Sequence, residues 1–150
     1  MLDIARAFDT VNHVQLLDNL QKKRVLLWFV QTVRSFLTNR TTTLIVNNEE
    51  TEPHQLQAGV LQGSLLLLIL FLFYNAPLLE ALNQPDLPLS PLGFADNVNL
   101  LTYKESTANN CTNLETAHKQ CLDWACTHRM RFAKSKYTLT HITRRKDVDV

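Results

Sequence analysis

Apolar positions in the early part of the chain recur at the spacing of an α-helix. From Val11 to Leu20 they return every three or four residues, and residues 26–37 repeat the pattern over a broader face. This periodicity predicts two amphipathic helices with the basic stretch 21–24 between them. Thr10 or Asn12 is placed to cap the first helix.

The pattern then changes to that of strands. Residues 41–46 are rich in β-branched side chains, and Asn47 and Asn48 follow them. β-branched residues favour strands and Asn favours tight turns. We therefore predict a strand over 41–46, a turn at Asn47-Asn48, and a partner strand within 52–57.

A second hairpin is predicted at residues 92–103. Two short apolar runs there flank Ala95, Asp96 and Asn97, and Asp and Asn tolerate the backbone that a tight turn needs. Taken alone, this turn would be interpreted as a surface hairpin that happens to contain an Asp. Any chemical role for Asp96 depends on residues elsewhere in the chain.

The remaining segments complete the predicted order of elements. Residues 65–82 are apolar over most of their length and predict a buried helix, because the apolar run 65–74 is shorter than the roughly 20 residues of a membrane span. The other assignments are a strand end at 1–4, loops at 58–64 and 83–91, a helix from Thr107 or Asn109 to about His128, a closing strand at 137–142 and a frayed charged tail at 144–150.

This order, strands interleaved with helices, predicts the α+β class. The natural arrangement is a split βαβ (ferredoxin-like) antiparallel sheet with the helices packed on one face. We see no internal repeat and no boundary between domains, so we expect a single domain over residues 1–150.

Composition narrows the function only a little. With 150 residues, of which 45% are hydrophobic, the chain is large enough for a real core. Its formal net charge of +1 gives no global field that would attract nucleic acid. A nucleic-acid partner must therefore be argued from motifs.

The three cysteines predict no disulfide framework. Cys111, Cys121 and Cys126 are odd in number and form no C-x-x-C pair, which favours a reduced, intracellular compartment. Together with His118 and His128 they fit no familiar zinc spacing. We expect ordinary helix residues at these positions.

Two carboxylates far apart in the sequence are the candidates for chemistry. Asp3 would end the first strand and Asp96 would lie at the tip of the second hairpin. Adjacent strands of one sheet could bring them together to hold divalent ions, as nucleotidyl transfer by two metal ions requires. Asp9 is the alternative, but it lies close to a helix start, where an Asp commonly stabilises the first turn. We assign Asp9 a structural role.

Four segments resemble the motifs of a reverse transcriptase palm of the non-LTR (LINE-like) retrotransposon type. Residues 2–13, with Asp3 and Phe8, are similar to motif A, and residues 58–64, with Gln62 and Gly63, are similar to motif B. Phe94-Ala95-Asp96-Asn97 resembles motif C, and residues 121–137 resemble motif D. Residues 28–40, with the turn Ser35-Phe36-Leu37-Thr38-Asn39-Arg40, match a further helix and turn of LINE-type enzymes.

The resemblance implies an RNA-directed DNA polymerase and assigns roles to these residues. Asp3 and Asp96 would be catalytic metal ligands for Mg²⁺ (or Mn²⁺), with Asn97 a third, weaker ligand. Phe8 would lie under the incoming sugar, Gln62 and Gly63 would contact the nucleotide and template, and Lys136 would donate a proton to the leaving pyrophosphate. The implied partners are an RNA template, a DNA primer and deoxynucleoside triphosphates, with no membrane. An intracellular location, with the nucleus as one compartment, would suit such an element.

The chain departs from the family pattern in three ways. Asn97 stands where the family has Asp, which removes a charge from the metal site, and the usual Pro-x-Ser-Pro after Ser64 is replaced by leucines. We also expect a partial domain, with motifs A to D of the palm but without fingers and thumb. Because positioning supplies most of the catalysis in phosphoryl transfer, we expect no useful polymerase activity from the isolated chain. The alternative is a non-catalytic retroelement remnant that acts at most as a nucleic-acid-binding or interaction module.

Overall fold

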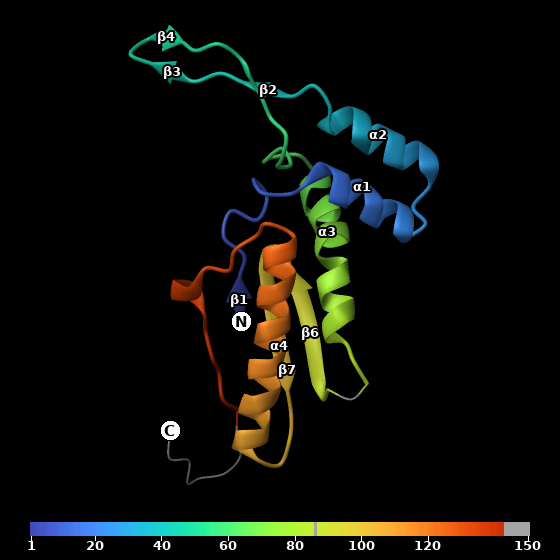
Figure 1. Ribbon diagram of the computed structural model, residues 1–150, viewed down its shortest axis with the longest axis vertical. Coiled ribbons are helices and arrows are strands. Elements are labelled where there is room, and N and C mark those ends of the chain that lie inside the picture. The colour runs from blue at the N-terminus through green and yellow to red at the C-terminus, as the bar shows by residue number, and fades with distance from the viewer. Residues whose placement is uncertain (86, 143–150) are drawn as a thin grey trace.

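The computed structural model describes residues 1–85 and 87–142, and an antiparallel sheet of three strands lies at its centre (Figure 1). The strands are β1 (Leu2–Asp3), β6 (Leu89–Phe94) and β7 (Asn97–Thr102), in the order β1-β7-β6. Since β7 is antiparallel to both neighbours, β1 and β6 run in the same direction on either side of it. With the helices below, this makes the chain an α+β protein. The predicted frayed tail at 144–150 lies outside the described residues.

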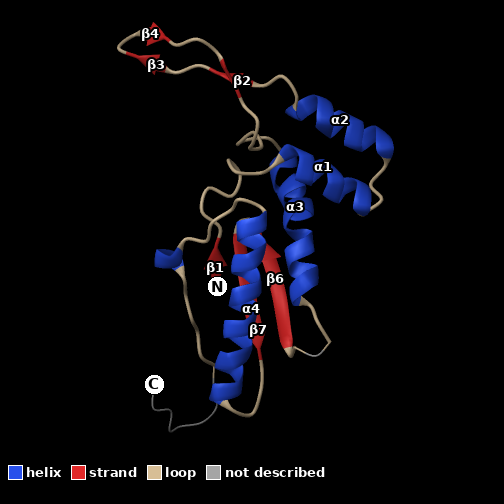
Figure 2. Cartoon of the chain, viewed as in Figure 1, coloured by secondary structure: helices blue, strands red, loops and turns tan. Residues whose placement is uncertain are grey.

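Of the four α-helices in the described residues, α3 (Leu66–Leu82) and α4 (Thr107–Thr127) pack on the sheet, and α1 (His13–Lys22) and α2 (Leu27–Leu37) lie beyond one end of it (Figure 2). All four were predicted from the apolar periodicity, and their ends differ from the predicted ones by only a few residues. α3 packs along β6, α4 along β7, and α1 lies between α2 and α3.

The start of α1 shows which of two predicted caps the chain uses. The Asn12 carboxamide oxygen accepts a hydrogen bond from the backbone N–H of Gln15, at 3.0 Å. Thr10 instead donates its hydroxyl to the carbonyl of Arg6, at 3.1 Å. Asn12 is therefore the cap, because its side chain satisfies one of the free N–H groups of the first turn.

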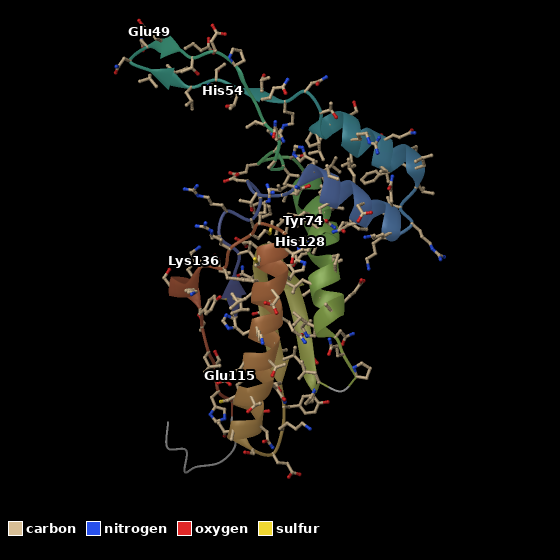
Figure 3. All side chains as sticks on the ribbon, in the orientation of Figure 1. Glu49, His54, Tyr74, Glu115, His128 and Lys136 are labelled. Atoms are coloured by element: carbon tan, nitrogen blue, oxygen red, sulfur yellow. The ribbon has the colours of Figure 1, made fainter. Side chains whose placement is uncertain are left out.

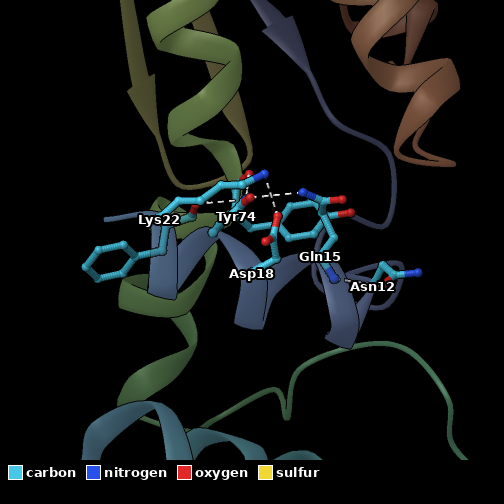
Figure 4. A network of polar contacts seen from close by, with 7 residues as sticks. Asn12, Gln15, Asp18, Lys22 and Tyr74 are labelled. Atoms are coloured by element: carbon cyan, nitrogen blue, oxygen red, sulfur yellow. Dashed lines mark hydrogen bonds and ion pairs between the residues drawn. The ribbon is translucent and has the colours of Figure 1, made fainter. Parts of the chain in front are cut away.

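A buried amide on α1 bonds to α3 near the proline inside that helix. Figure 4 shows the polar contacts of α1 around Gln15 and Tyr74. Pro77 lies inside α3 and has no N–H to offer the carbonyl of Phe73, four residues earlier. The side chain of Asn19, which is almost fully buried, donates to the carbonyls of Phe73 and Tyr74, each at 3.3 Å. Because Asn19 supplies the missing donor, α3 can carry a proline in its interior and still stay buried.

The core lies between α3, α4 and the sheet and continues under α1. Tyr74 and Phe71 of α3 are its largest fully buried side chains, and Ile4 and Val98 bring the sheet into it. Gly93 of β6 lies so close to α3 that an added Cβ would come within 2.8 Å of Leu79.

The β6–β7 hairpin confirms the prediction around Asp96. Ala95, at the turn, has a φ of +50°, and Phe94 faces Asn97 across the end of the ladder. The predicted loop 83–91 was too long, because β6 begins at Leu89 and includes Pro91. A proline can sit in this strand because β6 is at the edge of the sheet.

Residues 41–57 form a separate arm that extends away from the sheet (Figure 1). Its strands are β2 (Thr41–Thr42), β3 (Ile45–Val46), β4 (Glu49–Glu50) and β5 (His54–Gln55), paired as β2 with β5 and β3 with β4. The turn at Asn47 and Asn48 is confirmed, with φ values of +54° and +67°. The predicted partner within 52–57 is confirmed for Thr41–Thr42, which pair with His54–Gln55. The predicted continuous strand over 41–46 was wrong, because each ladder is two residues long and Ile45–Val46 pair with Glu49–Glu50 instead.

The predicted closing strand at 137–142 was also wrong. A short 3₁₀ helix, Lys134–Lys136, precedes it, and Leu139 and Ile142 are 78% and 90% exposed. Phe132 forms an isolated bridge with Ile4, and after the 3₁₀ helix Thr138 returns to this edge and exchanges backbone hydrogen bonds with Met1, at 2.7 and 3.2 Å. These contacts do not extend into a strand over the described residues, so the apolar side chains of Leu139 and Ile142 stay in solvent.

In the part of the chain that the structure describes, no helix combines the length and the apolar character that a membrane crossing requires.

Candidate active site

The fold brings the two predicted carboxylates to one corner of the sheet. Asp3, the last residue of β1, lies directly opposite Asn97, the first residue of β7. The next residue along, Ile4, donates its N–H to the carbonyl of Asp96 at 2.9 Å. Asp3 is buried, whereas Asp96 and Asn97 are half-buried. Three residues whose side chains offer oxygen atoms are therefore neighbours along the backbone ladder, although Asp3 lies far from the other two in the sequence.

Lys136 reaches the same corner from the 3₁₀ helix. Its Nζ is 3.2 Å from Oδ1 and 3.3 Å from Oδ2 of Asp3. The backbone sets this approach, because Ala133 donates its N–H to the carbonyl of Asp3 at 2.8 Å. The Lys136 side chain is 64% exposed, so the ion pair contributes at most about 1 kcal/mol to stability. Figure 3 shows Lys136 beside β1, far from Glu49 and His54 on the arm.

Asn97 interacts with its neighbour through its nitrogen atom. Its Nδ2 donates to Oδ1 of Asp96 at 3.3 Å. An aspartate at position 97 would place a second negative charge beside Asp96 instead. The amide therefore relieves a repulsion that the family's Asp-Asp pair would carry, and it leaves the corner with less negative charge.

The predicted nucleotide-contacting residues form a second group, where the motif B loop lies against the segment between β1 and α1. Val60 donates its N–H to the carbonyl of Phe8, and Gly59 donates to the carbonyl of Val11, each at 2.8 Å. The Phe8 ring packs edge-on against Phe71, with 5.1 Å between the ring centroids. These contacts hold Phe8 half-buried at the surface of the core.

Gln62 and Asp9 contact each other across these two segments. The Gln62 Nε2 donates to Oδ1 of Asp9 at 2.9 Å. Asp9 thus does not stabilise the first turn of α1, as the sequence suggested, because Asn12 holds that position. Gly63 has a φ of +90°, and a Cβ added there would meet nothing within 4 Å, so the loop is open at this residue.

Two residues that hold the motif B loop in place were given no role from the sequence. His13 Nε2 and Arg40 Nη1 both approach the carbonyl of Gly59, at 2.8 and 3.1 Å. Gly59 itself has a φ of +87°, and a Cβ there would meet the backbone oxygen of Asp9 at 2.9 Å. Both residues fall inside segments matched to the family, but no local pattern names a partner 46 or 19 positions away.

A contact between the half-buried Tyr137 and His118 ties the residues after the 3₁₀ helix to α4. The Tyr137 hydroxyl and His118 Nε2 are 3.1 Å apart, and Cys121 is fully buried nearby on α4. Burial raises the pKa of the Cys121 thiol to about 12, and burial followed by the charge of Cys121 raises the pKa of Tyr137. Through Tyr137, the chain directly after Lys136 is held against α4.

The donor set at the sheet corner suits a hard divalent cation. Among the described residues, no cluster of three or more His, Cys, Asp and Glu side chains could hold a metal. A Mg²⁺ site, however, often takes only one or two carboxylates, with water and phosphate oxygens completing the shell. Asp3, Asp96 and the amide oxygen of Asn97 fit that requirement.

Comparison with known proteins identifies the class. The family model for reverse transcriptase (RNA-dependent DNA polymerase) matches residues 1–149, and the chain belongs to this family. It is also similar to the retrovirus-related Pol polyprotein from the type-1 retrotransposable element R2 of Popillia japonica, with 30% identity over 128 residues. That alignment covers 77% of this chain and 21% of the relative, so the chain spans about a fifth of the relative's length. The predicted resemblance to a retrotransposon reverse transcriptase is thereby confirmed.

Proposed function

We propose that this chain is the palm of an RNA-directed DNA polymerase that extends a DNA primer on an RNA template by two-metal nucleotidyl transfer. The observation that carries the proposal is the register of β1 against β7. It places Asp3 opposite Asn97 and beside Asp96, at the corner where motifs A and C would have to meet.

The sheet topology supports the palm interpretation. β1 and β6 run in the same direction, helices connect them, and β7 lies between them. This connectivity supports the interpretation of the sheet as a split βαβ unit. On this interpretation residues 1–150 form one reverse transcriptase domain that carries motifs A to D.

At the sheet corner, each residue would act on one part of the reaction. Asp3 and Asp96 would hold Mg²⁺ or Mn²⁺, and Asn97 would be a weaker ligand. A divalent ion held there would lower the pKa of the primer 3′ hydroxyl and offset charge on the triphosphate. Lys136, a mobile cation beside Asp3, would donate a proton to the departing pyrophosphate.

The second group would position the nucleotide. Phe8, held against Phe71, would lie under the sugar and exclude a 2′ hydroxyl. Gln62 would contact the nucleotide, with Asp9 fixing its orientation, and Gly63 would allow the template backbone a close approach because it has no Cβ.

One observation favours a second candidate, a non-catalytic retroelement remnant that acts at most as a nucleic-acid-binding or interaction module. Asn97 removes a negative charge from the metal site and donates to Asp96. Both effects weaken the hold on a divalent ion. We therefore expect little synthesis by the natural sequence. The proposal also includes an intracellular location, with the nucleus as the candidate compartment.

Primer extension on poly(rA)/oligo(dT) with Mg²⁺ or Mn²⁺ tests the proposal. Asn97→Asp should raise synthesis by at least about tenfold, which corresponds to about 1.4 kcal/mol in the barrier. Asp96→Ala added to Asn97→Asp should abolish it, whereas Asp123→Ala, at an exposed position on α4, should leave it unchanged.

The two candidates give different outcomes in this assay. Synthesis that requires Asp96 supports the polymerase. If folded Asn97→Asp protein, verified by its circular dichroism, makes no product with either metal, the remnant is the better interpretation.

A further inference from the structure

Each carboxylate at the sheet corner accepts a hydrogen bond from another side chain of this protein. Asp3 faces the Lys136 ammonium, and Asp96 accepts from the Asn97 amide. Asp3 needs such a partner more, because its side chain is only 12% exposed and water can solvate little of it. Burying a charge without a partner is costly.

The geometry of the Lys136 contact is that of a cation shared by both oxygens. The distances from Nζ to Oδ1 and Oδ2 differ by only 0.1 Å, at 3.2 and 3.3 Å. The ammonium is therefore almost equidistant from the two oxygens. A divalent ion that binds a carboxylate through both oxygens is also equidistant from them, so it would compete with the ammonium for the same two atoms.

We propose that Lys136 occupies the cation position of Asp3, so that binding of a divalent ion at Asp3 and release of the Lys136 ammonium are one coupled step. This inference rests on the metal site of the proposed function. It adds that the Lys136 ammonium competes with the divalent ion for Asp3. Release would also free the ammonium for the leaving pyrophosphate only once a metal is bound.

The side chain can leave while the backbone stays in place. The 3₁₀ helix is tied to β1 by the hydrogen bond from Ala133 to Asp3, and Tyr137 is tied to His118 on α4. The Lys136 side chain between these two anchors is 64% exposed. A flexible lysine stem can therefore turn into solvent at little cost.

Mn²⁺ binding, followed by the loss of the free-ion electron paramagnetic resonance signal, tests the coupling in the full chain. Lys136→Met removes the competing charge and keeps much of the stem, so it should tighten Mn²⁺ binding by about five- to tenfold, as expected for an exposed ion pair. Lys134→Met is the matched control from the same 3₁₀ helix and should bind like the natural sequence. Asp3→Asn should weaken binding in every background.

Chemical labelling gives a second measurement that needs no variant. Reductive methylation followed by mass spectrometry should modify Lys136 more slowly than Lys134 without metal. Saturating Mg²⁺ should raise the rate at Lys136 and leave the rate at Lys134 unchanged, because only Lys136 is displaced.

The outcomes separate this inference from the proposed function. Mn²⁺ binding that depends on Asp3 but is not tightened by Lys136→Met, with no Mg²⁺ effect on labelling, overturns the coupling and leaves the metal site standing. If no variant, Lys136→Met included, binds Mn²⁺ in an Asp3-dependent way, the metal site itself is wrong and the coupling falls with it.

Discussion

The chain contains two regions of hairpin structure, which differ mainly in what lies behind them. The β6–β7 hairpin pairs six residues with six, with α3 packed along β6 and α4 along β7. The arm, residues 41–57, has ladders of only two residues, and residues 41–50 are all exposed. Both regions contain apolar strand-forming residues, yet Val98 of β7 is fully buried and Ile45 of the arm is 74% exposed.

The difference shows that burial, more than strand propensity, decides how far a ladder extends. A two-stranded ribbon gains little from its own side chains in water and needs a surface to pack on. The candidate site lies on the packed sheet, where the backbone is fixed on several sides. We therefore expect changes near β1 and β7 to affect stability and the site together, and changes in the arm to affect neither strongly.

The largest expected effect comes from a matched pair of isoleucines. Ile4, next to β1, is 1% exposed, and Ile4→Ala should lower the free energy of unfolding by about 2–5 kcal/mol, because it leaves a cavity in the core. Ile45→Ala in the arm should change it by less than about 0.5 kcal/mol. Urea unfolding followed by circular dichroism measures both. Equal losses in the two variants would mean that the arm is packed in solution, and the contrast between the regions would fail.

Substitutions at two glycines test how the loop after the arm packs against the segment between β1 and α1. Gly59→Ala should cost more than about 2 kcal/mol, because it adds a backbone clash with Asp9 to the cost of about 1–2 kcal/mol for an L-residue at positive φ. Gly63→Ala carries only the cost of its positive φ, since the added Cβ would meet nothing within 4 Å. Thermal unfolding compares the two. A larger loss from Gly63→Ala would contradict the close approach of the loop to Asp9.

The smallest expected effect is a pH dependence of the free energy of unfolding, caused by the buried thiol of Cys121 on α4. Folding raises the pKa of Cys121 from 9.0 to about 12, so the thiol favours the folded state only while it stays protonated. As pH rises above 9, the unfolded chain ionises first, and stability should fall by about 1.4 kcal/mol by pH 10. Cys121→Ala should be less stable at pH 8 but should lack this slope.

Thiol labelling provides the control for that prediction. Cys111 and Cys126 are exposed and should react readily with iodoacetamide in the folded chain, whereas Cys121 should react only on unfolding. Rapid labelling of Cys121 under native conditions would show that α4 is not closed over the sheet.

The same contrast explains which parts of the structure were predictable from sequence. The helices and the turn at Asp96 follow from local periodicity and turn chemistry, which act within a few residues. The strand predicted at 137–142 failed because the contact with this edge is divided: Phe132 bridges to Ile4, the 3₁₀ helix follows, and only Thr138 pairs with Met1 before the chain leaves the sheet. Pro91 was assigned to a loop because a proline disfavours strands, and only the sheet order shows that its strand lies at an edge.

Long-range contacts limited the prediction of the site in the same way. Asp3 and Asp96 were paired by family resemblance, and the register supports their proximity. The contacts of Gln62 with Asp9 and of Arg40 with Gly59 depend on how loops pack after the fold has formed. No spacing along the chain encodes them.

The contact between Asp3 and Lys136 also has a consequence for the order of events during synthesis. The two residues are 133 positions apart, and β1 has no partner strand until β7 has been made. Helices form rapidly from local contacts, whereas pairing between distant segments is slow. A nascent chain therefore carries Asp3 without a strand partner or counter-ion while α1, α2 and α3 form. Assembly of the carboxylate corner is one of the last steps of folding, and a ribosome that stalls before residue 136 leaves that corner open.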